Sequence, residues 1–377
     1  RTSCCGLNAS LKPNKLNKLN NLNKLNKLNK LKRLDRYKKG EIMIKVGLVG
    51  AGYWGKNLIR NFMASKHASL EMICDKDREK LKRMKQLYPG IRTVEKFDDI
   101  ITNRDLDAVV VSTNVNSHYA IAKKVIESGK NVFVEKPMAD TVARAEELVE
   151  LAKKKGIILM VGHTFLYSPP VMKIKDIIKN DGIGRVYYIS SSRVNLGIHQ
   201  SDVSVIFDLA PHDFSIISYW LDEVPNRISC IGYDYIQKGI SDVAFINLMF
   251  ASGTIAHIEI SWLAPSKLRR TTIVGEKKMI LYDDTNNLEK VKVFDKGVDV
   301  LSPENFGEFH LSYRVGDIVI PRIELSEPLA NEVGHFCECI ETGRKPRSDG
   351  INGLEVVKQL EAAEKSLHNS GGLVSIK

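Results

Sequence analysis

The chain has 377 residues, of which 43% are hydrophobic and 27% are charged. This length exceeds what one hydrophobic core usually holds, so two globular domains are expected. The formal net charge of +11 is typical of proteins that bind nucleic acid or acidic surfaces. However, the first 40 residues hold 12 Lys or Arg and one acid, Asp35, which leaves 44 basic and 44 acidic residues for the remainder. The body of the chain is therefore neutral, which argues against nucleic acid as its partner.

The N-terminal segment has a repetitive sequence. Between Lys15 and Leu34, leucine recurs at every third position of a Leu-Asn-Lys repeat. On an α-helix this period drifts by about 60° per repeat and forms no lasting apolar stripe, and Asn is a poor helix former. We predict that residues 1–42 are a low-complexity, disordered tail, with a basic arm for nucleic acid or anionic lipid as the alternative. Met43 would make a natural start, because Ile44 begins the first predicted strand.

Targeting signals and cysteine spacing indicate the compartment. The tail lacks the apolar stretch of a signal peptide, and no run of 18 apolar residues occurs anywhere. We therefore expect a cytoplasmic protein that does not enter the membrane. The cysteines lie at positions 4, 5, 74, 230, 337 and 339, without a paired CxxC spacing. Reduced, structural thiols are expected.

Residues 43–165 alternate short β-branched runs with helical stretches, a rhythm that predicts a doubly wound parallel sheet. The predicted strands are Ile44–Val49, Leu70–Cys74, Ala108–Ser112, Asn131–Val134 and Ile157–Val161. The predicted helices are Gly55–Ala64, Lys76–Leu87, Tyr119–Ser128 and Thr141–Lys154. The fold class is therefore α/β.

Residues 166–377 have longer, alternating strand patterns with turn signals between them, which predict a mostly antiparallel sheet in an α+β domain. The predicted strands are Val186–Arg193, Ser241–Phe250, Thr254–Ser261 and Thr271–Val274. Helical patterns return at Pro328–Thr342, which Gly343 and Pro346 end, and at Asn352–His368.

The first predicted strand leads into Gly50-Ala51-Gly52-Tyr53-Trp54-Gly55, a G-x-G-x-x-G motif between a strand and a helix. Such glycines allow a tight turn, the approach of a pyrophosphate and close helix packing, and the helix N-terminus offers N–H donors to anions. Asp75 follows the second strand, 20 residues beyond Gly55, where a ribose 2′-hydroxyl needs an acceptor. Its charge should repel a 2′-phosphate, so NAD is favoured over NADP, although Lys76 and Arg78 lie nearby. The alternative is a glycine turn that serves only packing.

Two further motifs carry chemistry. Lys136 of Glu135-Lys136-Pro137 follows a parallel strand, at the edge where open α/β sheets gather ligands. Asp208 and His212 are four residues apart and would share one helix face, with Pro211 in the first turn. A helix N-terminus would keep His212 neutral and able to accept a proton. The alternatives are an exposed lysine and a capping or packing histidine.

The three motifs, in this order, closely resemble the Gfo/Idh/MocA family of sugar and cyclitol dehydrogenases over residues 43–377. The resemblance implies an N-terminal Rossmann domain, a C-terminal domain with a large, mostly antiparallel sheet, and a homo-oligomer, either tetramer or dimer. It also implies that Lys136 and His212 flank the nicotinamide. Residues 161–169 and 193–197, and Ser201-Asp202-Val203 leading into 207–213, are similar to nucleotide-sugar 3-dehydrogenases. Those enzymes oxidise the C3 hydroxyl of UDP-N-acetylglucosamine or its uronic acid to a 3-keto sugar for surface polysaccharide synthesis.

The resemblance assigns roles to individual residues. His212 would be the base and Lys136 would hold the reacting oxygen, although Lys136 itself remains an alternative base, and Asp208 would orient His212 or bind a sugar hydroxyl. The cofactor would be bound by Gly50, Gly52, Tyr53, Trp54, Gly55, Asp75 and Glu135. The substrate, a small nucleotide sugar, would be bound by Lys136, His163, Tyr167, Arg193, Asn195 and His212. Arg193 is suited to a uronate or diphosphate, and a surface ion pair is its alternative role.

Other functions remain open at this point. The same motifs would serve a dehydrogenase of inositol or of a free sugar. A non-catalytic NAD-binding sugar sensor is the alternative of another class, and the presence of both Lys136 and His212 argues against it. His257 and Glu259 would face the same side of a strand, but no third residue has metal-ligand spacing, so no catalytic metal is expected.

Overall fold

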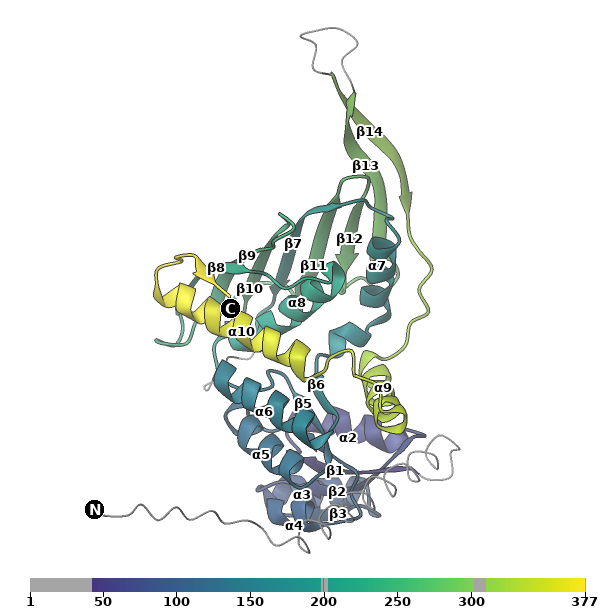
Figure 1. Cartoon of the computed structure of the whole chain (residues 1–377), viewed down its shortest axis with the longest axis vertical. Helices are drawn as coiled ribbons and strands as arrows, with labels where there is room; N and C mark the ends of the chain where they lie inside the picture. Colours follow the sequence, from purple (N-terminus) through teal and green to yellow (C-terminus); the bar gives the residue numbers. More distant parts are fainter. Residues whose placement is uncertain (1–42, 198, 200–202, 302–309, 377) are drawn as a thin grey trace, which may run out of the picture.

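The computed structural model describes residues 43–197, 199, 203–301 and 310–376. The predicted tail, and Ser201 and Asp202 of the similarity segment, lie outside the described residues. Two sheets organise the described chain, one after the other in sequence (Figure 1). The α/β class is confirmed, with a parallel N-terminal sheet and a mostly antiparallel C-terminal one.

The N-terminal sheet has the strand order β3-β2-β1-β4-β5-β6, and all of its pairs are parallel. Its strands are β1 Ile44–Val49, β2 Ala68–Cys74, β3 Arg92–Val94, β4 Ala108–Val111, β5 Asn131–Glu135 and β6 Leu159–Gly162. The helices that connect them are α2 Gly55–Ala64, α3 Arg78–Leu87, α4 Phe97–Thr102, α5 Val115–Glu127 and α6 Val142–Lys155. The strand order reverses between β1 and β4, which is where such sheets bind ligands at their carboxyl ends. This is the predicted Rossmann arrangement.

The C-terminal sheet has the order β14-β13-β12-β11-β7-β10-β9-β8-β15. Its strands are β7 Val186–Val194, β8 Arg227–Tyr233, β9 Val243–Met249, β10 Ile255–Ser261, β11 Leu268–Gly275, β12 Met279–Asp283, β13 Val291–Leu301, β14 His310–Val319 and β15 Val374–Ser375. Its pairs are antiparallel except β7 with β10. Along β9, Ala244, Ile246 and Leu248 are buried, whereas Phe245 is exposed. One face of this sheet therefore forms the core.

Helices cover that inner face (Figure 1). They are α7 Pro169–Lys179, α8 Val205–Leu221 and α10 Gly350–His368, and a 3-10 turn, η1 Thr164–Tyr167, joins β6 to α7. The structure corrects one prediction here. Helix α8 begins at Val205, with Ser204 as its cap, so Pro211 lies inside the helix and His212 is not at its N-terminus.

The last two helices return to the first domain. Helix α9, Pro328–Thr342, packs against α2, and its Phe336 ring meets Phe133 of β5 edge-on at 5.7 Å between ring centroids. Helix α10 packs against α6 and β6 as well as against β8 and α8. Residues late in the sequence therefore pack against the N-terminal domain. None of the helices in the described chain combines the length and hydrophobicity that crossing a bilayer requires.

Candidate active site

The turn between β1 and α2 has the geometry of a dinucleotide loop. Gly50 has a φ of 99°, and a Cβ there would lie 2.6 Å from the Ser112 carbonyl oxygen. A Cβ at Gly55 would lie 2.0 Å from the Gly50 carbonyl oxygen. At Gly52, by contrast, a Cβ would meet no atom within 4 Å. Two glycines are thus required by packing, and the open space at Gly52 fits the approach of a ligand backbone.

The charge around this turn also suits a dinucleotide. The first turn of α2 contains no acidic residue, so no carboxylate there opposes an anion at this helix N-terminus. Asp75, directly after β2, accepts hydrogen bonds from the amides of Ala51 at 2.7 Å and Asp77 at 2.9 Å. Its carboxylate therefore lies beside the glycine turn, where it can receive ribose hydroxyls and repel a 2′-phosphate.

Two aromatic residues follow Gly52. Tyr53 is 85% exposed. The Trp54 indole donates a hydrogen bond of 2.6 Å to Oε1 of Glu135, which connects the turn to the end of β5. Glu135 is buried, and this burial raises the pKa of its carboxyl to about 7, against the favourable contributions of Lys136 and Trp54.

Lys136 and Asp208 meet across the domain boundary. The Lys136 ammonium donates to the Asp208 carbonyl oxygen at 2.7 Å and lies 3.3 Å from its carboxylate. The second carboxylate oxygen accepts from the Trp262 indole at 3.2 Å. We expected Asp208 to orient His212 or bind a sugar hydroxyl; in the structure its carboxylate contacts Lys136 and Trp262. Asp208 therefore holds the ammonium group in place.

His212 lies one helical turn beyond Asp208 and is completely buried at its ring nitrogen Nδ1, which has no hydrogen-bond partner. Its ring meets Phe165 edge-on, with 4.9 Å between centroids. Burial, followed by the charges of Lys136 and Arg193, holds the pKa of His212 well below its usual range. Burial and neighbouring cations, rather than a helix N-terminus, therefore favour the neutral imidazole.

His163 follows β6 and joins the same cluster. It is buried, and neither ring nitrogen has a partner. Burial and, to a lesser extent, the Lys136 charge lower the pKa of His163 to about 3. Buried polar atoms are rarely left unsatisfied, so unpaired nitrogens on both histidines indicate a place for a polar ligand.

Arg193, near the end of β7, forms a buried ion pair. Its Nε donates to Asp213 at 2.6 Å, and Ser191 donates to the same carboxylate at 2.8 Å. The guanidinium lies 4.7 Å from the Phe165 ring centroid. Its Nη1 is buried without a partner, which leaves one donor free on the side chain. Arg269 lies over the same ring at 5.7 Å.

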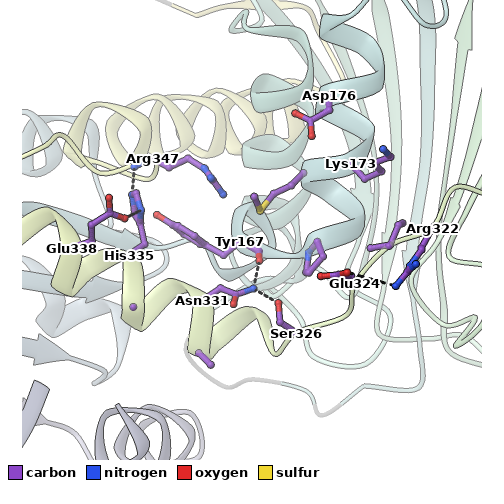
Figure 2. Close-up of a pocket in the computed structure, with 15 residues that line it drawn as sticks. Tyr167, Lys173, Asp176, Arg322, Glu324, Ser326, Asn331, His335, Glu338 and Arg347 are labelled. Atoms are coloured by element: carbon purple, nitrogen blue, oxygen red, sulfur yellow. Dashed lines mark hydrogen bonds and ion pairs between the residues drawn. The ribbon is translucent and has the colours of Figure 1, made fainter. Parts of the chain in front are cut away.

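The two remaining predicted substrate residues are Tyr167 and Asn195. The buried Tyr167 hydroxyl is hydrogen-bonded to the Ser348 hydroxyl at 2.9 Å. Its ring lines a cavity of about 680 Å³ between α7, residues 322–326 and α9, whose walls include none of Lys136, His163, Asp208 or His212 (Figure 2). Tyr167 is thus a wall residue of another cavity. Asn195 is half-buried beyond β7, where its backbone N–H donates to the Ser261 carbonyl oxygen at 3.2 Å.

The structure also brings in residues that sequence reasoning missed. Phe165 and Trp262 contact His212 and Asp208, and Asp213 pairs with Arg193. Asp213 follows His212 directly and could have been found as a neighbouring acid. Trp262 comes from the end of another strand and gives no local signal.

The side chains considered as metal ligands are engaged elsewhere. His257 is hydrogen-bonded to Asn247 at 2.9 Å, and Glu259 accepts from Ser192 at 2.9 Å. Within the described ranges, no group of three or more His, Cys, Asp or Glu has an arrangement that could hold a metal. Four thiols, at Cys74, Cys230, Cys337 and Cys339, are free and buried.

A Rossmann turn built for a dinucleotide, beside a lysine, an acid and neutral histidines, defines a two-domain dinucleotide-dependent oxidoreductase. The chain belongs to the Gfo/Idh/MocA family. Residues 44–163 match the family described as "Oxidoreductase family, NAD-binding Rossmann fold", and residues 171–281 match the "GFO/IDH/MocA C-terminal domain". The N-terminal domain is therefore an NAD-binding domain.

Curated relatives and solved structures agree with this assignment. The UDP-N-acetylglucosamine 3-dehydrogenase of Acidithiobacillus ferrooxidans is 22% identical over 84% of this chain and 95% of its own length. Its structure aligns with a TM-score of 0.73 at 21% identity, over 87% of this chain and 99% of that one. The inositol 2-dehydrogenase of Rhizobium meliloti is 23% identical over 86% of this chain and 97% of its length. Relatives with different substrates are thus equally similar.

Proposed function

We propose that this chain is an NAD-dependent dehydrogenase that oxidises the C3 hydroxyl of a UDP-N-acetylhexosamine, or of its uronic acid, to a 3-keto sugar for surface polysaccharide synthesis. The observation that carries the proposal is the contact of Lys136 with Asp208 beside the half-buried His212, whose pKa lies well below its usual range. These groups come from the two domains and converge at the carboxyl edge of the parallel sheet, where the cofactor binds.

Each residue has a definable part in such a reaction. NAD, when bound, would accept a hydride from the carbinol carbon. His212 is neutral and has an unpaired Nδ1, so it can accept the hydroxyl proton. The Lys136 ammonium, held by Asp208, can donate a hydrogen bond to the same oxygen and stabilise its developing negative charge. Lys136 remains the alternative base.

Arg193 supports an anionic substrate. Its Nε and Nη2 donate hydrogen bonds to Asp213, and the buried Nη1 has no hydrogen-bond partner. A guanidinium binds carboxylate or diphosphate oxygens well because it is planar and offers several donors. The likeness of residues 193–197 to nucleotide-sugar dehydrogenases points the same way. We include His163, with its two unpaired nitrogens, and Asn195 as substrate-binding residues.

The inositol dehydrogenases among the relatives favour a second candidate, oxidation of a cyclic polyol. The test is to incubate the chain with NAD and, separately, UDP-N-acetylglucosamine, its uronic acid and myo-inositol, and to measure product mass. We expect a UDP-sugar product that has lost two hydrogen atoms. Lys136→Met and His212→Leu should each lower turnover by about 100-fold or more, whereas Lys173→Met, in the separate cavity, should not.

Oxidation of only myo-inositol would establish the second candidate. Binding of a sugar without any product, in the presence of bound NAD, would support the sensor instead and refute the dehydrogenase. Full turnover after replacement of both Lys136 and His212 would disprove their roles.

A further inference from the structure

Helix α9 carries a buried acid that the proposed reaction does not use. The Glu332 side chain is fully buried. The Thr164 hydroxyl donates a hydrogen bond of 2.7 Å to its Oε2, and its Oε1 is buried with no partner. An unpaired buried carboxyl oxygen carries a free-energy cost, so a group absent from the protein itself should satisfy it.

The direction of this side chain follows from the helix. Asn331, His335 and Glu338 recur at helical spacing and face the cavity outside α9 (Figure 2). Glu332 comes from the buried side of α9 and reaches Thr164, two residues beyond the end of β6. It therefore lies at the carboxyl edge of the parallel sheet, away from that cavity.

The neighbours of Glu332 identify the occupant. Glu135, at the end of β5, is close enough to raise the pKa of Glu332, together with burial, well above its usual range. Glu135 accepts hydrogen bonds from the Trp54 indole and the Lys136 backbone N–H. His163 directly precedes Thr164 in the sequence. In a Rossmann domain the two halves of the dinucleotide lie on opposite sides of the β1–β4 switch point. Asp75 is on the β2 side, so groups at β5 and β6 face the nicotinamide half.

We propose that Glu332 is a further cofactor-binding residue, whose free Oε1 forms a hydrogen bond with the carboxamide of the nicotinamide ring. This proposal rests on the NAD-binding domain and is independent of the sugar substrate. Glu332 is the neutral acid here, because Glu135 has two hydrogen-bond donors and Glu332 has only one. A carboxamide offers both a donor and an acceptor, so a neutral acid or its amide can pair with it.

The experiment compares the binding of two ligands, NAD and ADP-ribose, which lacks the nicotinamide ring. Dissociation constants are measured by quenching of tryptophan fluorescence for the full chain and for Glu332→Leu and Glu332→Gln. Glu338→Gln is the matched control, because it removes an exposed carboxylate from the other face of α9. We expect Glu332→Leu to raise the dissociation constant of NAD by about 10-fold and to leave that of ADP-ribose within about 2-fold. The two Gln variants should bind both ligands like the unaltered chain.

A second variant guards against misfolding of Glu332→Leu. Thr164→Val keeps the side-chain shape and removes the hydroxyl that holds Oε2 of Glu332. It should therefore weaken the binding of NAD and leave the binding of ADP-ribose unchanged. Equal weakening of both ligands would show a structural role for Glu332 and overturn the proposal, as would unchanged NAD binding in all variants. Failure of the unaltered chain to bind ADP-ribose would refute the dinucleotide site itself.

Discussion

Replacement of Arg193 by methionine should destabilise the C-terminal domain strongly. The side chains of Arg193 and Asp213 are only 7% and 3% exposed, and the guanidinium donates to both carboxylate oxygens, at 2.6 and 3.4 Å. In the variant, Asp213 keeps only the Ser191 hydroxyl as a partner. A buried charge that loses its counter-ion costs about 3–5 kcal/mol. At about 2–4 °C per kcal/mol for a domain of this size, the melting temperature should fall by roughly 6–20 °C.

The same sheet contains a matched control. Arg270 donates to Asp283 through Nε at 3.2 Å and Nη2 at 2.9 Å, but its side chain is 51% exposed. Arg270→Met should therefore cost no more than about 1 kcal/mol. The double replacement Arg193→Met with Asp213→Leu removes both buried charges and should recover most of the loss. Thermal unfolding followed by tryptophan fluorescence measures all three. Equal shifts for Arg193→Met and Arg270→Met would refute the argument from burial.

Three further predictions concern the cofactor turn, its acid and the tail. Gly52→Ala should fold normally and weaken the binding of NAD. Gly55→Ala should also lower the melting temperature, since its Cβ would lie 2.0 Å from a carbonyl oxygen. Equal melting temperatures for the two variants would contradict this. The pKa of Glu135 is raised from 4.5 to about 7, so its contribution to stability is complete below pH 4.5 and is lost as pH rises to about 7. Relative to Glu135→Gln, the unaltered chain should lose about 3 kcal/mol over that interval in urea unfolding, and parallel pH profiles would disprove it. A chain beginning at Met43 should have the same dehydrogenase activity as the full chain, and salt-sensitive nucleic-acid binding by the longer form alone would revive the basic-arm alternative.

The fold could be predicted well where local patterns are strong. Strand β1 and helices α2 and α9 have the predicted limits, because each combines clear periodicity with a glycine or proline signal at an end. The three-residue β3 and the six-residue α4 were missed, since elements so short have no measurable period. Helix α8 was predicted only around Asp208 and His212, and its start at Val205 was obscured by Pro211.

The candidate site divides in a similar way. Motif residues such as Gly52 and Lys136 were found because their spacing has a physical reason that is visible in sequence. The contact of Asp208 with Lys136 was not foreseen, because it spans 72 positions and joins two domains. Glu332 gave no signal at all, since an acid in a helix is normally a solvated residue. Only its burial in the folded chain distinguishes it.

The return of α9 and α10 to the first domain means that the two sheets cannot be treated as separable parts. A fragment that ended at residue 165 would expose the apolar surfaces of Phe133 and Val161, because Phe336 of α9 packs against Phe133 and Gly353 of α10 packs against Val161. Such a fragment should aggregate rather than fold, and loss of the last 50 residues should abolish nucleotide binding from a distance in sequence. Helices α9 and α10 are thus structural parts of the NAD-binding domain, although they follow it by more than 150 residues in the sequence.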